Sequence, residues 1–242
     1  MRLSLVIPAV DSRDAILATV DSALRHVARY PGAEIVVVDR SSGDTETLLE
    51  PLTTEASALR VQKSAELDTA AVVREGLLAA AGDFVVLTEA DLAYPLAEID
   101  RIVAALDDGA DVAAATRFDR ESRILLSPLR FHALYAQHLA HRAFNATVRA
   151  ALGLAVTDSL AGLKGFRRAA AQSVAARQTV RGLAFHVELL FLAQRFGLAI
   201  REVPVLYRPP SDPSPRRRLG ELARALADVW RIRQNARHGR YR

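Results

Sequence analysis

The chain has 242 residues, of which half are hydrophobic and a quarter are charged, as in folded globular proteins rather than disordered ones. It contains no cysteine, which excludes disulfides and zinc–thiolate sites. The formal net charge is +4, and only Lys63 and Lys164 are lysines, so nearly all of the positive charge is arginine. This bias has two interpretations, a GC-rich coding sequence or selection for guanidinium groups that bind phosphate.

The sequence carries no pattern of membrane insertion or export. No stretch approaches the roughly 18 consecutive apolar residues of a membrane span, and the N-terminus lacks the basic and long apolar regions of a signal peptide. We therefore expect a cytoplasmic protein.

Short apolar runs alternate with amphipathic helical patterns along the first half of the chain. The runs LSLVIP, EIVVVD, LRVQ and FVVLTEAD predict strands, and the segments between them predict helices at 14–30, 44–57 and 68–81. Continuous Val, Ile and Leu runs of this length are typical of a parallel sheet covered by helices on both faces. The pattern predicts an α/β fold with a Rossmann-like, mostly parallel sheet.

The second half of the chain is less regular. Its predicted elements are a helix at 94–108, the strand DVAAATR, helices at 128–152 and 184–196, and the strand LAIREVPVLY. A segment with four prolines in seven residues follows and is typical of a linker. We therefore divide the chain into a domain at 1–208, a linker at 209–215 and a basic amphipathic helical tail at 216–242.

Polar residues follow several predicted strands, and in such sheets ligands bind beyond the carboxyl ends of the strands. Glu89 and Asp91 follow FVVLT, and alternate residues of an extended segment point the same way. Paired carboxylates are ligands for Mg²⁺ or Mn²⁺, whereas the alternative is a solvated turn or a helix cap. Asp39 ends EIVVVD, where it either caps the next helix or hydrogen-bonds the base or ribose of a ligand.

Seven blocks of the sequence resemble glycosyltransferase family 2, in particular its polyprenyl- and dolichyl-phosphate mannose and glucose synthases. The blocks are LSLVIPAV, EIVVVDRSSGDT, VVLTEADLAYP, DVAAATRF, TDSLAGLKGFRR, FHVELLFLAQRFG and IREVPVLY, in the order and spacing of the family. The resemblance implies a GT-A fold that binds a UDP- or GDP-linked sugar. It further implies transfer of the sugar, with inversion, to a polyprenyl phosphate or a similar acceptor, and a need for Mg²⁺ or Mn²⁺.

The resemblance also assigns roles to individual residues. Pro8, Ala9 and Asp39 match nucleotide-binding positions, with Asp39 at the base. The nucleotide-sugar and metal motif of the family, D-x-D, aligns with Glu89, Ala90 and Asp91, in which Glu89 and Asp91 are the metal ligands and Asp91 touches the metal directly.

The catalytic residues that the resemblance implies are Asp158, Arg117 and Asp91. Asp158 matches a candidate base or acceptor-positioning residue. An acceptor phosphate is already anionic near neutral pH, so Asp158 need only orient it. The residues expected to contact the acceptor or the phosphates are Arg117, Arg130, Lys164, Arg167 and Glu188.

The sequence departs from the family pattern in the nucleotide and metal region. Val10 replaces an aromatic residue that would stack on the base, and Arg40 replaces a carboxylate. Residues 67–69 lack a lysine expected near the diphosphate, Ala93 lacks the amide oxygen that helps to hold the metal, and His186 replaces an aspartate. Two hypotheses follow: a working transferase with an altered donor or weaker metal dependence, and a catalytically impaired GT-A domain that acts as a binding or assembly partner.

Two histidines, His138 and His141, lie three residues apart in a predicted helix, a spacing compatible with two metal ligands. No further histidine or carboxylate stands at ligand spacing, so we interpret them as exposed or core-edge residues.

The basic character of the chain is concentrated at its C-terminal end. Residues 214–242 hold nine arginines and two acids, a net charge of +7, which leaves the rest of the chain at −3. The apolar residues predicted to share one helix face are Leu219, Leu222, Leu226, Val229 and Trp230. This pattern fits an anionic membrane surface on the inner face of the cell membrane, or packing on the domain or on a second subunit of a homo-oligomer. Nucleic acid is not an expected partner, because no recognisable binding module accompanies the charge.

Overall fold

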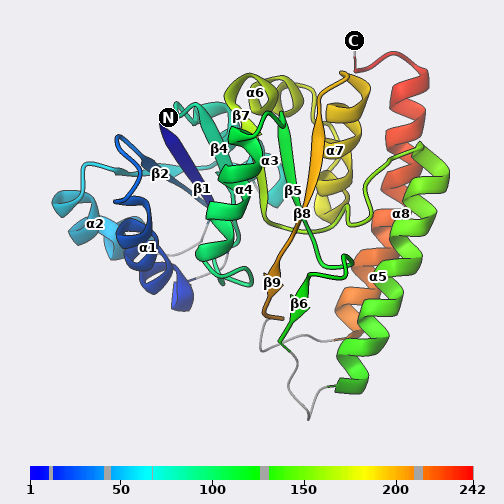
Figure 1. Ribbon diagram of the computed structural model, residues 1–242, viewed down its shortest axis with the longest axis horizontal. Coiled ribbons are helices and arrows are strands. Elements are labelled where there is room, and N and C mark those ends of the chain that lie inside the picture. The colour runs from blue at the N-terminus through cyan, green and yellow to red at the C-terminus, as the bar shows by residue number, and fades with distance from the viewer. Residues whose placement is uncertain (11–12, 41–44, 67, 126–130, 210–214, 242) are drawn as a thin grey trace.

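A central sheet of seven strands, in the order β3-β2-β1-β4-β7-β5-β8, organises the computed structural model (Figure 1). The structure describes residues 1–10, 13–40, 45–66, 68–125, 131–209 and 215–241. The strands are β1 (Leu3–Ala9), β2 (Glu34–Asp39), β3 (Leu59–Lys63), β4 (Phe84–Leu87), β5 (Val112–Thr116), β7 (Lys164–Arg167) and β8 (Ile200–Pro204). All neighbours pair in parallel except β7, which runs antiparallel between β4 and β5. The mostly parallel α/β sheet predicted from the sequence is confirmed.

Helices cover both faces of the sheet. They are α1 (Arg13–Val27), α2 (Thr45–Glu55), α3 (Thr69–Ala79), α4 (Ala97–Asp107), α5 (Phe131–Leu152), α6 (Arg168–Ala176), α7 (Phe185–Arg195) and α8 (Pro215–Arg237), with a 3-10 turn, η2 (Gly182–Ala184), before α7. The predicted helix positions agree with those observed to within a few residues at most ends. Helix α6 was not predicted.

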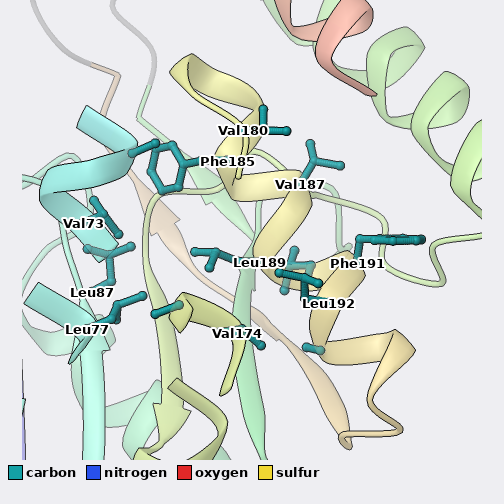
Figure 2. Close-up of a cluster of buried hydrophobic side chains, with 14 of the residues drawn as sticks. Val73, Leu77, Leu87, Val174, Val180, Phe185, Val187, Leu189, Phe191 and Leu192 are labelled. Atoms are coloured by element: carbon teal, nitrogen blue, oxygen red, sulfur yellow. The ribbon is translucent and has the colours of Figure 1, made fainter. Parts of the chain in front are cut away.

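Two hydrophobic clusters form the core, one on each face of the sheet. Alternate strand residues supply them: Leu5 and Ile7 of β1 belong to the cluster with α1 and α4, whereas Val6 belongs to the cluster with α3, α6 and α7. Figure 2 shows the second cluster, whose labelled members are Val73, Leu77, Leu87, Val174, Val180, Phe185, Val187, Leu189, Phe191 and Leu192.

Helix α7 is buried on all sides, with every residue from 185 to 193 inaccessible to solvent or nearly so. A helix that is apolar all round belongs in a core. Two ionisable residues, His186 and Glu188, are buried with it, and each therefore needs a specific polar environment.

A small parallel sheet of two strands, β6 (Arg123–Ile124) and β9 (Leu206–Tyr207), extends the carboxyl side of β5 and β8 (Figure 1). This sheet was not predicted, because each strand has only two residues and no apolar run of its own. It carries Tyr207 to the edge of the sheet where the candidate site lies.

The C-terminal helix α8 packs beside α5, as Figure 1 shows. Its buried apolar residues are Leu222, Ala225, Val229 and Ile232, and Tyr241 beyond its end is also buried. Of the apolar residues predicted to share one face, Leu226 and Trp230 are instead 40% and 52% exposed. The helix thus packs on the domain, one of the two alternatives for this segment, and leaves two large apolar side chains outside.

No helix in the described part of the chain is long and apolar enough to cross a membrane.

Candidate active site

The carboxyl ends of β1 and β2 lie side by side and bring the predicted nucleotide-binding residues together. Pro8 pairs with Val38 and Ala9 with Asp39 in the parallel register. The backbone N–H of Arg40 donates to the carbonyl of Ala9 at 2.9 Å, which holds the two strand ends in line. Ala9 and Asp39 are buried, so Asp39 is presented by rigid backbone rather than by a free loop.

The loop that follows β4 carries the carboxylate pair. Asp91 is exposed, and its Oδ1 accepts a hydrogen bond from the backbone N–H of Ala93 at 3.0 Å. Leu92 has a φ of 49°, and among the described residues it is the one non-glycine with positive φ. A left-handed backbone at a leucine is strained, and such strain persists where the surrounding structure holds it, often at functional sites. The turn therefore fixes the direction of Asp91.

Glu89 leans across Gly162. A Cβ atom at Gly162 would overlap the Glu89 carboxylate as it lies here, so a larger residue at position 162 would require the Glu89 side chain to move. The loop before β7 and the Glu89 side chain are thus in close contact at the edge of the sheet.

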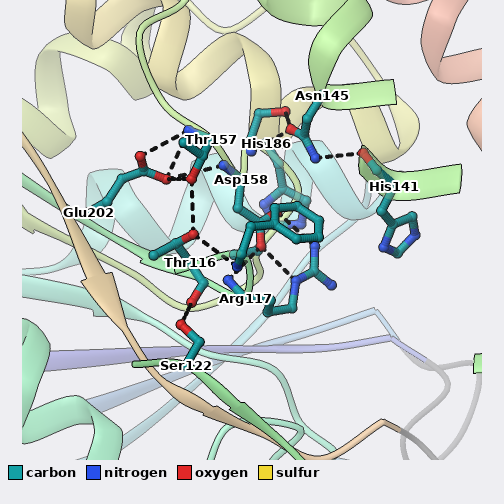
Figure 3. Close-up of polar contacts among 12 residues, drawn as sticks. Thr116, Arg117, Ser122, His141, Asn145, Thr157, Asp158, His186 and Glu202 are labelled. Carbon is teal, nitrogen blue, oxygen red and sulfur yellow. Dashed lines mark hydrogen bonds and ion pairs between the residues drawn. The ribbon is translucent and has the colours of Figure 1, made fainter. Parts of the chain in front are cut away.

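Arg117 and Asp158 form a buried ion pair at the end of β5 (Figure 3). Arg117 donates from Nε to Oδ2 at 2.7 Å, from Nη2 to Oδ1 at 2.8 Å and from its backbone N–H to Oδ2 at 3.0 Å. Burial alone would raise the pKa of Asp158, but the charge and hydrogen bonds of Arg117 outweigh burial and lower it. Asp158 is therefore ionised at neutral pH with both oxygens engaged, a geometry that favours orientation over proton abstraction.

The loop that holds Asp158 is fixed from both sides. Glu202 of β8 accepts hydrogen bonds from the backbone N–H of Thr157 at 2.9 Å and of Asp158 at 3.1 Å. On the other side, Asn145 of α5 accepts from the backbone N–H of Ser159 at 2.8 Å (Figure 3). Glu202 and Asn145 were not predicted from the sequence, although the single acid in the predicted strand LAIREVPVLY was a signal that could have been used.

Lys164 begins β7 and is completely buried beside this pair. Its ammonium group donates to the carbonyl of Ala161, and its Nζ lies 3.4 Å from Nδ1 of His186. Burial lowers the pKa of Lys164 to about 7, an effect that the charge of Asp158 partly opposes. Burial also lowers the pKa of His186 well below its ordinary value, and the charge of Lys164 adds to this, so His186 is neutral.

Two of the residues predicted to contact the acceptor, Arg167 and Glu188, are engaged elsewhere in the fold. Arg167 pairs with Phe84 at the opposite edge of the sheet, because β7 is antiparallel, and its guanidinium donates to the carbonyls of Leu106 and Ala110. The prediction that Arg167 contacts the acceptor is therefore wrong. Arg130, which is also predicted to contact the acceptor, lies outside the described residues.

Glu188 is also engaged elsewhere. Its carboxylate is fully buried and accepts from the backbone N–H groups of Thr179 and Val180 at 2.9 and 2.8 Å and from the hydroxyl of Tyr241 at 2.6 Å. These bonds tie the segment before α7 to the end of the chain. The structure gives Glu188 a structural role rather than the predicted contact with the acceptor.

An apolar cavity of about 220 Å³ opens beside Arg117. Its lining includes Phe118, Ile124, Leu134 and Tyr207, with the guanidinium of Arg117 lying 5.2 Å from the centre of the Tyr207 ring. The cavity thus combines hydrocarbon walls with one buried cation.

His138 and His141 line the same cavity from α5 and are half-buried, as core-edge residues. Burial, followed by the charges of Arg142 and Arg117, lowers the pKa of His138. The described residues contain no group of three or more His, Cys, Asp or Glu side chains that could hold a metal ion.

Glu89 and Asp91 remain the residues that fit a divalent cation. Two carboxylates are enough for Mg²⁺ or Mn²⁺ when water and substrate phosphates complete the coordination. The close fit of Glu89 over Gly162 and the fixed turn at Asp91 give these oxygens defined positions. The donor set therefore fits a metal that is shared with a bound diphosphate.

Residues 4–174 match the family model described as Glycosyl transferase family 2. The chain belongs to this family. The match includes β1, β2, the carboxylate pair, Arg117 and Asp158.

Relatives in the family act on lipid phosphates according to their names. A dolichol-phosphate mannosyltransferase of Pyrococcus furiosus is 27% identical over 51% of this chain and 35% of its own length. An undecaprenyl-phosphate 4-deoxy-4-formamido-L-arabinose transferase of Yersinia pestis is 25% identical over 69% of this chain and 49% of its own. The chain thus spans about a third to a half of the length of these curated relatives.

Solved structures share the fold over nearly the whole chain. Glucosyl-3-phosphoglycerate synthase from Mycobacterium tuberculosis, in complex with uridine diphosphate, aligns with a TM-score of 0.70 and 20% identity over 96% of this chain and 80% of its own. The same enzyme with Mn²⁺, uridine diphosphate and glucosyl-3-phosphoglycerate gives a TM-score of 0.65 at 21% identity, over 96% of this chain and 79% of its own. The GT-A fold that the sequence blocks implied is confirmed.

Proposed function

We propose that this protein is a glycosyltransferase that requires a divalent metal and moves a sugar, with inversion, from a UDP- or GDP-linked donor to a polyprenyl phosphate or a similar lipid phosphate. The observation that carries the proposal is the position of Arg117. Its buried guanidinium is held by Asp158 and lines an apolar cavity. A buried cation beside hydrocarbon walls suits a ligand with an anionic head and an apolar chain.

The donor binds along the carboxyl ends of β1, β2 and β4 in this proposal. Asp39 contacts the base, and Pro8 and Ala9 provide the adjacent backbone surface. Glu89 and Asp91 are the residues that would hold Mg²⁺ or Mn²⁺ near the diphosphate. Support comes from the register that sets Ala9 beside Asp39 and from the fixed carboxylate pair one strand away.

The reaction needs no strong base from the protein. An oxygen of the acceptor phosphate attacks the anomeric carbon, and the bond from that carbon to the diphosphate breaks, so that its electron pair leaves with the nucleoside diphosphate. The acceptor is already ionised because the second pKa of a phosphate monoester is about 6. Glu89 and Asp91 are the residues that would hold a divalent cation, which would supply positive charge to offset the charge on the departing diphosphate. Arg117 neutralises and orients the acceptor phosphate, and Asp158 orients Arg117.

The acceptor reaches the site from a membrane surface in this proposal. Phe131, Tyr135 and Leu139 recur at every fourth residue of α5 and are about half exposed, and Leu226 and Trp230 are exposed on the neighbouring α8. Tyr135 also lines the apolar cavity beside Arg117. Exposed aromatic residues beside the arginine-rich helix α8 suit an anionic lipid surface and support a position at the cytoplasmic face of the membrane.

The alternative is a catalytically impaired GT-A domain that binds a partner or takes part in an assembly. It is favoured by Ala93, which brings no amide oxygen to the metal motif, and by the substitutions at Val10 and Arg40. Calorimetry of the full chain with UDP and GDP, with and without Mn²⁺, separates the two hypotheses. Binding of either nucleotide that depends on metal supports the transferase. Absence of binding to both nucleotides contradicts it and supports the impaired domain.

A further inference from the structure

A second cavity, of about 510 Å³, lies between Glu89 and the C-terminal helix. Its lining comes from four parts of the chain: the start of α3, the loop after β4, the turn that leads into α7, and α8. The polar residues among them are Thr69, Glu89, Arg181, His186, Glu221, Arg224 and Asp228. Helix α8, which sequence analysis treated as a tail, therefore forms one wall of a cavity that contains a predicted metal ligand.

This wall is a fixed part of the fold. Leu222, Ala225 and Val229 anchor α8 in the core, and Ala225 also lines the cavity. The turn opposite α8 is held by the backbone N–H of Gly182, which donates to the Asp68 carboxylate at the start of α3 at 3.1 Å. The cavity walls thus keep their relative positions without a ligand.

The charges in the cavity are mixed rather than of one sign. Arg181 and Arg224 supply guanidinium donors, whereas Glu89, Glu221 and Asp228 supply carboxylate acceptors. The sixth ionisable group, His186, is kept neutral by burial, which lowers its pKa well below the ordinary value. Beyond Glu89, which is proposed to hold the metal, a polyanion such as a diphosphate would meet the carboxylates of Glu221 and Asp228 here. Hydroxyl groups, which donate and accept hydrogen bonds, match both kinds of side chain.

The position of the cavity also suits a sugar. In the proposed donor complex the base lies at β2 and the diphosphate at β4, so the sugar continues past Glu89, away from Asp39. The cavity begins at Glu89 and reaches His186, whose Nδ1 lies 3.4 Å from Lys164 beside the Arg117–Asp158 pair. A sugar in this cavity therefore lies between the metal ligands and the residues proposed to bind the acceptor.

We propose that this cavity binds the sugar ring of the nucleotide donor, and that Arg224 of α8 is a specificity-determining residue that hydrogen-bonds its hydroxyl groups. This inference rests on the proposed function, because it requires a nucleotide-linked sugar. It assigns to the C-terminal helix a part of the donor site.

The test compares Arg224→Ala with the wild-type full chain by calorimetry in the presence of Mn²⁺, using UDP, GDP and a panel of UDP- and GDP-linked hexoses. We expect the variant to bind the free nucleotide as the wild type does, and to bind the preferred nucleotide sugar about tenfold more weakly, since a charged hydrogen bond is lost. Arg224→Lys keeps the positive charge but lacks the planar guanidinium group, so it should lower the affinity for the nucleotide sugar less than Arg224→Ala does. Arg237→Ala, an exposed arginine of the same helix outside the cavity lining, is the matched control.

Equal affinity of wild type and Arg224→Ala for every nucleotide sugar would overturn this inference and leave the proposed function standing. The same holds if the wild type binds each nucleotide and its sugar derivative with equal affinity, because the sugar then makes no contact. If the wild type binds neither nucleotides nor nucleotide sugars, the proposed function itself fails and this inference fails with it.

Discussion

The carboxylate of Asp158 holds the guanidinium of Arg117 at two points, with Nε–Oδ2 and Nη2–Oδ1 distances of 2.7 and 2.8 Å. It also accepts the backbone N–H of Arg117, so both the side chain and the main chain of the arginine are fixed. The direction of the positive charge at the apolar cavity is therefore set before any substrate binds. Such preorganised charge is usually the largest contribution to catalysis of group transfer.

Replacing Asp158 by asparagine keeps the shape of the side chain and removes its charge. We expect kcat for sugar transfer to fall by about a hundredfold, because Arg117 loses its orientation, while the affinity for the nucleotide donor is unchanged. Steady-state kinetics and donor binding measure the two effects. Asp108→Asn, at an exposed aspartate paired with Arg201, is the control. Wild-type kcat in Asp158→Asn would show that the ion pair has no role in transfer.

A methyl group added at Gly162 tests the fit of Glu89. Because the new Cβ would overlap the Glu89 carboxylate, we expect Gly162→Ala to weaken Mn²⁺-dependent nucleotide binding by about tenfold while the fold is retained. Gly220→Ala is a matched control, since a Cβ at Gly220 of α8 meets no atom within 4 Å. Circular dichroism reports the fold, and calorimetry reports the affinity. Unchanged metal-dependent affinity in Gly162→Ala would contradict the placement of Glu89 in the metal site.

Lys164 should make stability depend on pH above neutrality. Burial lowers its pKa from 10.5 to about 7, so between these values the unfolded chain binds more protons than the folded protein. The free energy of unfolding therefore rises as the pH increases from 7, by at most about 1.4 kcal/mol per pH unit. Below pH 7 the lysine is protonated in both states, and its contribution stays constant.

Chemical denaturation at a series of pH values from about 6 to 9 measures this effect against Lys164→Met, which should lack the rise. Lys63→Met removes the other lysine of the chain, which is exposed, and should keep the wild-type pH dependence. Parallel pH profiles for the wild type and Lys164→Met would mean that Lys164 titrates normally.

The exposed apolar residues of α5 and α8 should carry binding to lipid. We expect Tyr135→Glu and Trp230→Glu each to reduce sedimentation with anionic vesicles several-fold, because each change removes an aromatic contact and adds a like charge to the lipid. Leu78→Glu, at an exposed leucine of α3, is the control. Deleting 216–242 is a poor test, because it would also remove buried Ile232 and Tyr241. If all variants sediment equally with vesicles and Trp230→Glu dissociates a dimer, the exposed apolar residues of α8 contact a second subunit instead of lipid.

Much of the fold could be predicted from the sequence because its strands are buried on both faces. The runs that form β1, β2 and β4 are continuous and apolar, and the residues that follow them stand where α/β sheets bind ligands. The sequence segments that resemble the glycosyltransferase family identified Arg117 and Asp158 as further candidate site residues. The structure brings these two residues together in an ion pair.

The direction of β7 could not be read from its residues. A four-residue strand has no signature of antiparallel pairing, and this pairing moves Arg167 to the far edge while it leaves Lys164 at the site. Glu188 was misassigned for a related reason, since its partners Thr179 and Tyr241 lie outside the sequence blocks that carry the resemblance. The packing of α8 could not be predicted either, because a basic amphipathic pattern does not identify the surface that its apolar face contacts.

The most direct test of the central claim is a transfer assay with the purified full chain, Mn²⁺, a panel of UDP- and GDP-linked sugars and a polyprenyl phosphate. We expect sugar from at least one donor to appear on the lipid phosphate with inverted anomeric configuration, and chelation of the metal to abolish transfer. Absence of transfer from every donor, with the metal present and nucleotide binding intact, would contradict it.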